Sequence, residues 1–243
     1  MSSPDVSLIL PAYNEAHAIA GAIAEARGYF QARGLAAEII VAADGGDGTR
    51  ELVRELAVND PALKAIGHRE RAGKGRGVRE GVALAAGAII GYADADRKVP
   101  IEEFAAVEPW LSQGFEVVLG SRALAASRVE RRPPLYRRMG SRGFAVFMQA
   151  VVGLPGIFDT QCGFKFFSRG AAKRVFSHQR VDGYMFDVEI LAIAQRLGYR
   201  IKEVPVRWRD DGDSRLDLVS GNLRNVRDLF RIRRSLANLG AAA

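Results

Sequence analysis

Two aspartates, Asp94 and Asp96, stand one residue apart in the stretch "GYADADRKVP" (91–100), directly after an apolar run. A carboxylate is costly to bury without a partner, so two of them at the end of an apolar segment indicate a positively charged ligand. Alternate positions beyond a strand allow both carboxylates to reach one hard divalent cation, Mg²⁺ or Mn²⁺, which prefers oxygen ligands and would also bind phosphate. Two unrelated surface aspartates are the alternative interpretation.

Two segments of the chain are rich in arginine. Residues 122–142 hold seven arginines against one glutamate, and residues 222–234 hold five against one aspartate, within a net charge of +7. Such blocks favour an anionic partner, namely phosphate, nucleic acid or an anionic membrane surface, and a solvated basic face is the alternative. Neither block has the interleaved aromatic residues or the groove-reading motif of nucleic-acid binding, so no nucleic-acid partner is predicted.

The elements that position these residues alternate between strands and helices. Short β-branched runs predict strands at 6–10, 38–43, 88–93 and 116–120, and alanine-rich segments with helical spacing lie between them. Asn14 is predicted to be the N-cap of the first helix. This alternation predicts an α/β fold with a mostly parallel sheet, which binds ligands beyond the carboxyl ends of its strands. Polar residues follow the predicted strands at that edge: Asn14, Glu15, Asp44, Asp94 and Asp96.

The composition is that of an ordinary globular protein, with 243 residues of which 48% are hydrophobic and 26% are charged. Cys162 is the only cysteine, which excludes an intramolecular disulfide. The first residues lack the basic flank and long apolar core of a signal peptide, and no apolar run approaches the roughly 20 residues that span a bilayer. We therefore expect a cytoplasmic protein, with peripheral contact at the inner face of the membrane as an extension of that expectation.

Eight motifs occur in an order that resembles a known family. They are "LPAYNEA" (10–16), "ADGGDGT" (43–49), "AGKGRGVREG" (72–81), "ADAD" (93–96), "GSR" (120–122), "DTQCGFKFF" (159–167), "FDVEIL" (186–191) and "EVPVRW" (203–208). Together they resemble the family 2 inverting glycosyltransferases, and the last three resemble the dolichyl- and polyprenyl-phosphate hexose synthases, particularly the glucose-transferring branch.

The resemblance implies a GT-A fold with a Rossmann-like nucleotide-binding half. We expect a single domain over residues 1–235, divided into a nucleotide-sugar half at about 1–122 and an acceptor half at about 123–235. Residues 236–243 are expected to form a flexible tail.

The resemblance also implies roles for individual residues. The nucleotide sugar is expected to contact Pro11, Tyr13, Glu15, Asp44, Lys74, Asp94, Gln161 and Arg215. Asp94 and Asp96 are expected to bind the metal, and the expected catalytic residues are Asp96, Asp159 and Arg122. The acceptor phosphate is expected to contact Arg122, Arg137 and Ser141. Asp44 and Asp159 have an alternative interpretation as turn residues, and an aspartate that reads the base does not by itself choose between UDP and GDP.

Two positions depart from the family pattern. Ala43 stands where the family usually has an aspartate, in a turn one residue shorter, and Lys98 stands where a neutral group often helps to hold the metal. A protonated lysine cannot ligate a cation, so Lys98 either points to solvent or neutralises diphosphate beside the metal.

The predicted function is inverting transfer of a hexose to a polyprenyl phosphate. UDP-glucose is the favoured donor, and GDP-mannose is the alternative. A phosphate acceptor is already ionised near neutral pH and needs no general base. Two alternatives stay open: a soluble hydroxyl acceptor with Asp159 as base, and a nonenzymatic nucleotide-sugar-binding relative. A sugar nucleotidyltransferase would share the α/β sheet, but the glycine-rich signature of nucleotidyl transfer is absent near the first predicted strand. The segment 216–239 predicts a helix that either packs on the domain or lies on anionic lipid.

Overall fold

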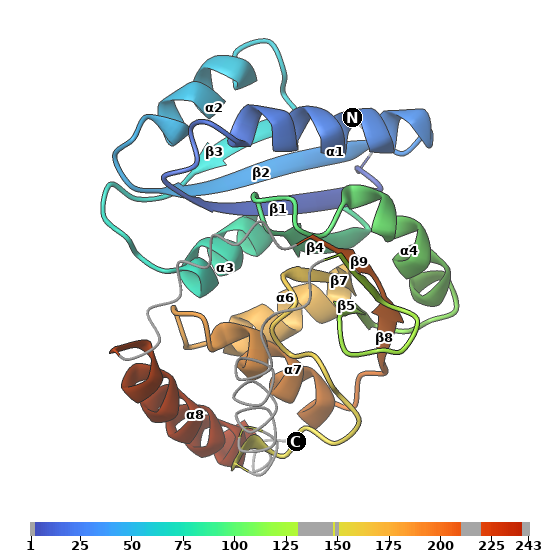
Figure 1. Ribbon diagram of the computed structural model, residues 1–243, viewed down its shortest axis with the longest axis vertical. Coiled ribbons are helices and arrows are strands. Elements are labelled where there is room, and N and C mark those ends of the chain that lie inside the picture. The colour runs from blue at the N-terminus through green and yellow to red at the C-terminus, as the bar shows by residue number, and fades with distance from the viewer. Residues whose placement is uncertain (1–2, 131–147, 149–150, 210–219, 240–243) are drawn as a thin grey trace.

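The computed structural model describes residues 3–130, 148, 151–209 and 220–239 (Figure 1). Its strands are β1 (Val6–Tyr13), β2 (Ala37–Asp44), β3 (Leu63–Ile66), β4 (Ile89–Ala93), β5 (Val117–Ser121), β6 (Arg128–Val129), β7 (Phe164–Ser168), β8 (Ile201–Pro205) and β9 (Arg207–Trp208). Its helices are α1 (Ile19–Ala32), α2 (Thr49–Ala57), α3 (Lys74–Leu84), the 3-10 turn η1 (Ile101–Glu103), α4 (Phe104–Ser112), α6 (Arg169–His178), α7 (Phe186–Arg196) and α8 (Ser220–Leu239). The predicted alternation of strands and helices over the first 120 residues is confirmed.

Seven strands form one sheet in the order β3-β2-β1-β4-β7-β5-β8. Within it β7 runs antiparallel to β4 and β5, and the other four pairs are parallel, so the predicted mostly parallel sheet is confirmed. β6 and β9 form a separate two-stranded sheet. β7 comes after β5 in the chain but lies between β4 and β5 in the sheet. It therefore brings the "DTQCGFKFF" segment beside these two strands.

Helices cover both faces of the sheet (Figure 1). Leu8 and Leu10 of β1 pack in a core with α1, α2 and α4, whereas Ile9 between them packs in a second core with α3, α6 and α7. Strands that are buried on both faces need apolar residues at successive positions, which explains the continuous runs "VSLIL" and "EIIVAA".

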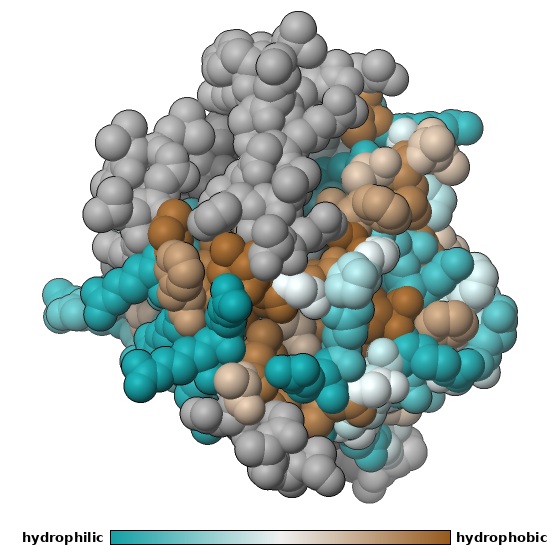
Figure 2. Space-filling model, turned by 90° about the horizontal axis from the view of Figure 1, so that it is seen from below, coloured by the Kyte–Doolittle hydropathy of each residue, from teal (hydrophilic) through white to brown (hydrophobic). Residues whose placement is uncertain are grey.

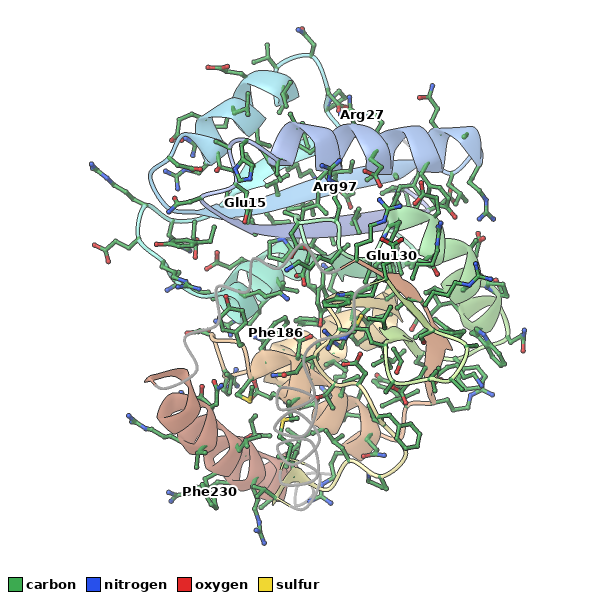
Figure 3. The ribbon with its side chains drawn as sticks, in the orientation of Figure 1. Glu15, Arg27, Arg97, Glu130, Phe186 and Phe230 are labelled. Carbon is green, nitrogen blue, oxygen red and sulfur yellow. The ribbon has the colours of Figure 1, made fainter. Side chains whose placement is uncertain are left out.

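The C-terminal helix α8 packs against α7 through one side. Leu229, Ile232 and Leu236 are buried there at helical spacing, so the interpretation of this segment as a packed helix is confirmed. Residues 236–239, which we expected at the start of a flexible tail, belong to this helix because Leu236 is buried in the core. Phe230 is 54% exposed on the outer side (Figure 3). Within the described residues, no helix combines the length and apolarity needed to cross a membrane.

Candidate functional site

The carboxyl ends of β1 and β2 lie side by side, because Tyr13 pairs with Asp44 in the parallel register. Asp94 follows β4, which pairs with the other side of β1, so it reaches the same edge. Pro11 has no N–H, but β1 stops pairing with β4 at Ile9, so the proline is tolerated within the strand. The structure thus brings the polar residues that follow these strands to one edge of the sheet.

The turn after β1 differs from the predicted helix cap. Asn14 has a left-handed backbone (φ 55°), and α1 begins only at Ile19, so the prediction that Asn14 caps this helix is wrong. A capping residue needs an extended backbone, whereas asparagine tolerates the left-handed region of a tight turn. Glu15 is held at this turn, where its backbone N–H donates to Thr49 Oγ1 at 3.0 Å (Figure 3).

Asp44 holds the loop that leads to Lys74. Its Oδ1 accepts from the backbone N–H of His68 at 3.0 Å, and its Oδ2 accepts from those of Ala72 and Gly73 at 2.8 and 3.1 Å. A carboxylate oxygen can accept two hydrogen bonds, so Oδ1 has capacity beyond its bond to His68. Asp44 therefore has a structural role in holding this loop, and its role in reading a base stays a prediction.

An aromatic and cationic group stands beside these strand ends. The guanidinium of Arg71 lies over the Tyr13 ring, with 4.5 Å between its carbon and the ring centroid, and it donates to the Tyr184 hydroxyl at 3.0 Å. Tyr13 and Tyr184 are both exposed. Arg71 was not predicted from the sequence, because its position next to Tyr13 results from the loop that Asp44 holds.

Each of the two strand-end aspartates faces a lysine. Lys74 Nζ lies 2.6 Å from Asp94 Oδ1, and Lys98 Nζ lies 3.4 Å from Asp96 Oδ2. Burial of Lys74 disfavours its charged form, but the nearby carboxylates of Asp94 and Asp187 outweigh this effect and raise the lysine's pKa. Lys74 is therefore an ammonium at neutral pH, and Lys98 lies beside Asp96 rather than pointing away from it.

Gly163 leaves the space that the Asp94 carboxylate fills. A Cβ added at Gly163 would stand 2.0 Å from Asp94 Oδ2, and the Gly163 carbonyl accepts from the Asp94 backbone N–H at 3.0 Å. Gly163 was not predicted to belong to the site, because only the antiparallel pairing of β7 with β4 brings it to Asp94.

Arg122 and Asp159, which we expected to act on different parts of the substrates, form a bidentate ion pair. Arg122 Nε and Nη2 donate to Asp159 Oδ2 and Oδ1 at 2.7 and 2.8 Å, and the Arg122 backbone N–H also donates to Oδ2. Burial opposes ionisation of Asp159, but the hydrogen bonds and charge of Arg122 prevail and lower its pKa. Asp159 is thus an ionised carboxylate whose charge is balanced by Arg122, and such a carboxylate is a poor proton acceptor.

The residues next to Asp159 have different surroundings. Gln161 is exposed, whereas Cys162 is buried, and burial together with the charge of Asp159 raises the pKa of its thiol to about 12. A protonated, buried thiol behaves as a small hydrophobic side chain. Arg137, Ser141 and Arg215 lie outside the described residues, so the roles expected for them stay predictions.

A buried charge cluster lies behind Lys74. Asp187 and Lys165 are 2% and 0% exposed, and the Lys165 ammonium and the Tyr92 hydroxyl both donate to Asp187 Oδ1. Asp187 Oδ2 lies 3.9 Å from Lys74 Nζ. The sequence does carry one signal for this cluster, since a lysine in the middle of the apolar strand "GFKFF" requires a buried counter-ion.

Comparison with known sequences points to one family. The model of the family described as Glycosyl transferase family 2 matches residues 7–176. The chain is 35% identical to dolichyl-phosphate beta-glucosyltransferase ALG5C of Trichomonas vaginalis, over 93% of this chain and 70% of that protein. It is 31% identical to the human dolichyl-phosphate beta-glucosyltransferase, over 94% of this chain and 74% of that protein.

Comparison with solved structures concerns the fold. Glucosyl-3-phosphoglycerate synthase of Mycobacterium tuberculosis, solved with Mn²⁺, UDP and phosphoglyceric acid, superposes with a TM-score of 0.68. The match covers 95% of this chain and 78% of that one at 21% sequence identity. At this identity the likeness supports the GT-A architecture, and the predicted fold class is confirmed.

Proposed function

Because the chain belongs to glycosyl transferase family 2, we propose that it transfers glucose from UDP-glucose to a polyprenyl phosphate, with inversion at the anomeric carbon. The names of its relatives give a β-linked glucose and a dolichyl phosphate acceptor, and the solved neighbour contains UDP. The observation in this chain that carries the proposal is the set of cations at the carboxyl edge, where Lys74 pairs with Asp94 and Arg122 pairs with Asp159.

The nucleotide would bind at the ends of β1 and β2. Tyr13 and Arg71 provide stacking surface, and Asp44 Oδ1 can accept the imide N–H of uracil in addition to its bond from His68. Pro11 and Glu15 line the same edge. Lys74 stands at the first position of α3, from which its ammonium can reach a diphosphate.

The donor set fits a divalent cation. Asp94 and Asp96 offer half-exposed carboxylates at the binding edge, and Gly163 provides the room that Asp94 needs. Within the described residues, no group of three or more His, Cys, Asp and Glu side chains surrounds a common point, so diphosphate and water would supply the other ligands. A bound Mg²⁺ or Mn²⁺ would neutralise charge that builds on the departing diphosphate.

Substitution of Gly163 by alanine should impair this cation site without unfolding the protein. The new Cβ would collide with the end of the Asp94 side chain, which can move aside and would then lose its position. We expect the affinity for UDP in the presence of Mn²⁺ to fall about tenfold or more, by loss of one charge-assisted contact. Titration calorimetry measures this affinity, and the melting temperature reports the fold.

Gly170→Ala is the matched control, because a Cβ at Gly170 meets nothing within 4 Å. This variant should bind UDP and Mn²⁺ as the wild type does. Wild-type affinity in the Gly163→Ala variant would show that Asp94 does not hold the cation.

In the proposed reaction, an acceptor phosphate oxygen attacks the anomeric carbon as the bond from that carbon to the UDP oxygen breaks. The bonding electrons leave with UDP, and the new bond lies on the opposite face of the sugar. A phosphate monoester is largely dianionic at neutral pH because its second pKa is about 6, so no side chain has to remove a proton. Asp159 takes two side-chain N–H groups of Arg122, and the guanidinium has three others that can hold the acceptor phosphate in line.

A hydroxyl acceptor would require a general base. Asp159 was the candidate for that role, but Arg122 pairs with it and its pKa is lowered. A carboxylate in this state accepts a proton poorly, and so the pair favours an acceptor that is already ionised.

The outer side of α8 supports peripheral contact with a membrane. Phe230, Arg227 and Arg231 are exposed on this helix, whose opposite side packs against α7. In the coloured part of the surface seen from below, hydrophobic residues lie between hydrophilic ones (Figure 2). Arginines with an aromatic residue on one side of a helix suit the interface of an anionic bilayer.

Transfer of radiolabelled sugar tests the proposal directly. The purified protein is incubated with Mn²⁺ and either UDP-glucose or GDP-mannose, and a polyprenyl phosphate is supplied in neutral or in anionic vesicles. We expect β-linked glucosyl phosphate lipid from UDP-glucose, formed faster on anionic vesicles. Exclusive use of GDP-mannose would overturn the donor, and transfer only to soluble hydroxyl compounds would overturn the acceptor. Equal rates on both kinds of vesicle would argue against electrostatic docking through α8.

A further inference from the structure

The ammonium of Lys74 lies between two carboxylates. Asp94 Oδ1 is 2.6 Å from Nζ, and Asp187 Oδ2 is 3.9 Å from it on the inner side. The Lys74 side chain is only 16% exposed, and its ammonium also lies within 6 Å of the ring centres of Tyr92 and Phe186. The ammonium therefore has two anionic partners and little access to water.

The two oxygens of Asp187 have different partners. Oδ1 accepts from Tyr92 and Lys165, and Oδ2 is the oxygen that faces Lys74. Lys165 is also bound by the Cys162 carbonyl at 2.6 Å, so its position does not depend on Asp187 alone. Asp187 can consequently take a second ammonium on Oδ2 without giving up the contacts of Oδ1.

The backbone around Lys74 is fixed against the start of α7. Gly73 has a left-handed backbone (φ 112°), the Gly75 N–H donates to the Asp182 carbonyl at 2.8 Å, and a Cβ on Gly75 would stand 2.5 Å from the Phe186 Cβ. The start of α3 is therefore packed closely against the start of α7, and Figure 3 shows Phe186 beside it. Movement of the ammonium is left to the side chain, and about 1 Å brings it within hydrogen-bond distance of Asp187.

We propose that Asp187 is a positioning residue that provides Lys74 with a second carboxylate, so that the ammonium can release Asp94 to a divalent cation while it stays next to the diphosphate. The inference rests on the proposed function, since cation and diphosphate belong to that reaction. Lys74 and the divalent cation compete for the Asp94 carboxylate. Asp187 lowers the free-energy cost of moving the Lys74 ammonium away from Asp94. The contribution of Asp187 therefore depends on the presence of Lys74.

Binding of Mn²⁺ in the absence of nucleotide, followed through the paramagnetic resonance signal of free Mn²⁺, tests this dependence. Lys74→Met removes the competing charge and should tighten Mn²⁺ binding about tenfold, while it weakens binding of UDP to the Mn²⁺-loaded protein. Asp187→Asn should weaken Mn²⁺ binding about tenfold in the wild-type background. In the Lys74→Met background the same substitution should change it less than about twofold.

Glu189→Gln is the matched control. Glu189 lies on the same helix, is equally buried and accepts hydrogen bonds from the backbone N–H groups of Arg180 and Val181. Its substitution should lower the melting temperature and leave Mn²⁺ affinity unchanged, which separates damage to α7 from loss of the Lys74 partner.

Equal effects of Asp187→Asn with and without Lys74 would overturn this inference and leave the proposed function intact. If Asp187→Asn does not fold, the Lys74→Met variant decides, because it keeps the contacts of Asp187 with Lys165 and Tyr92. Unchanged Mn²⁺ affinity of Lys74→Met would overturn the inference. A wild-type protein that binds neither Mn²⁺ nor UDP would overturn the proposed function and this inference with it.

Discussion

Replacement of Asp96 by alanine is expected to abolish glucosyl transfer while the protein stays folded. The side chain is 39% exposed, and its contacts are the ammonium and the backbone N–H of Lys98, so its loss removes little that stabilises the fold. The same loss removes one of the two carboxylates that would hold the cation. We expect kcat/KM to fall by about three orders of magnitude, equivalent to about 4 kcal/mol of transition-state stabilisation.

The neighbouring variant Lys98→Gln serves as the control. It removes a positive charge 3.4 Å from Asp96 and should tighten Mn²⁺ binding, because less charge competes with the ion. Radiolabelled transfer and Mn²⁺ titration are measured on both variants, with circular dichroism to confirm the fold. Near-normal turnover of Asp96→Ala with Mn²⁺ present would refute the assignment of the metal site. Unchanged or weaker Mn²⁺ affinity of Lys98→Gln would show that Lys98 does not act on the ion.

Replacement of Arg122 by alanine should impair use of the acceptor far more than binding of the donor. We propose that the Arg122 guanidinium binds the acceptor phosphate. Its loss should lower kcat/KM for polyprenyl phosphate about 100-fold. The KM for UDP-glucose should change less than about threefold. High salt should reduce acceptor use by the wild type more than by the variant, since screening acts on the charge that the variant lacks.

The ion pair with Asp159 makes a second variant necessary. Arg122→Ala leaves a buried carboxylate without its partner and should destabilise the fold by about 2 to 3 kcal/mol. The double variant Arg122→Ala/Asp159→Asn removes that charge, so it should recover most of the lost stability and none of the acceptor use. Normal transfer by the folded double variant would mean that Arg122 serves Asp159 and not the acceptor.

Local patterns in the sequence were sufficient for four of the seven strands of the sheet, β1, β2, β4 and β5, and for its binding edge. Continuous apolar runs predict strands that are buried on both faces, and "VSLIL" became part of β1 for that reason. The pair Asp94 and Asp96 follows β4 as expected, because the position of a residue relative to its own strand is a local property. The cap predicted at Asn14 failed, since the choice between a cap and a left-handed turn depends on the loop of β2 against which Asn14 packs.

Which charges meet was decided by the tertiary structure. Arg122 and Asp159 are 37 residues apart, and Tyr92 and Asp187 are 95 apart, so no local periodicity relates them. The insertion of β7 between β4 and β5 brings Gly163 to Asp94. It also places Lys165 in the interior, where Asp187 is its ion-pair partner within the described part of the chain. A sequence shows which side chains are charged and on which face of an element they lie. The energy of a buried charge depends instead on the partner that the tertiary arrangement of the elements brings within a few ångströms.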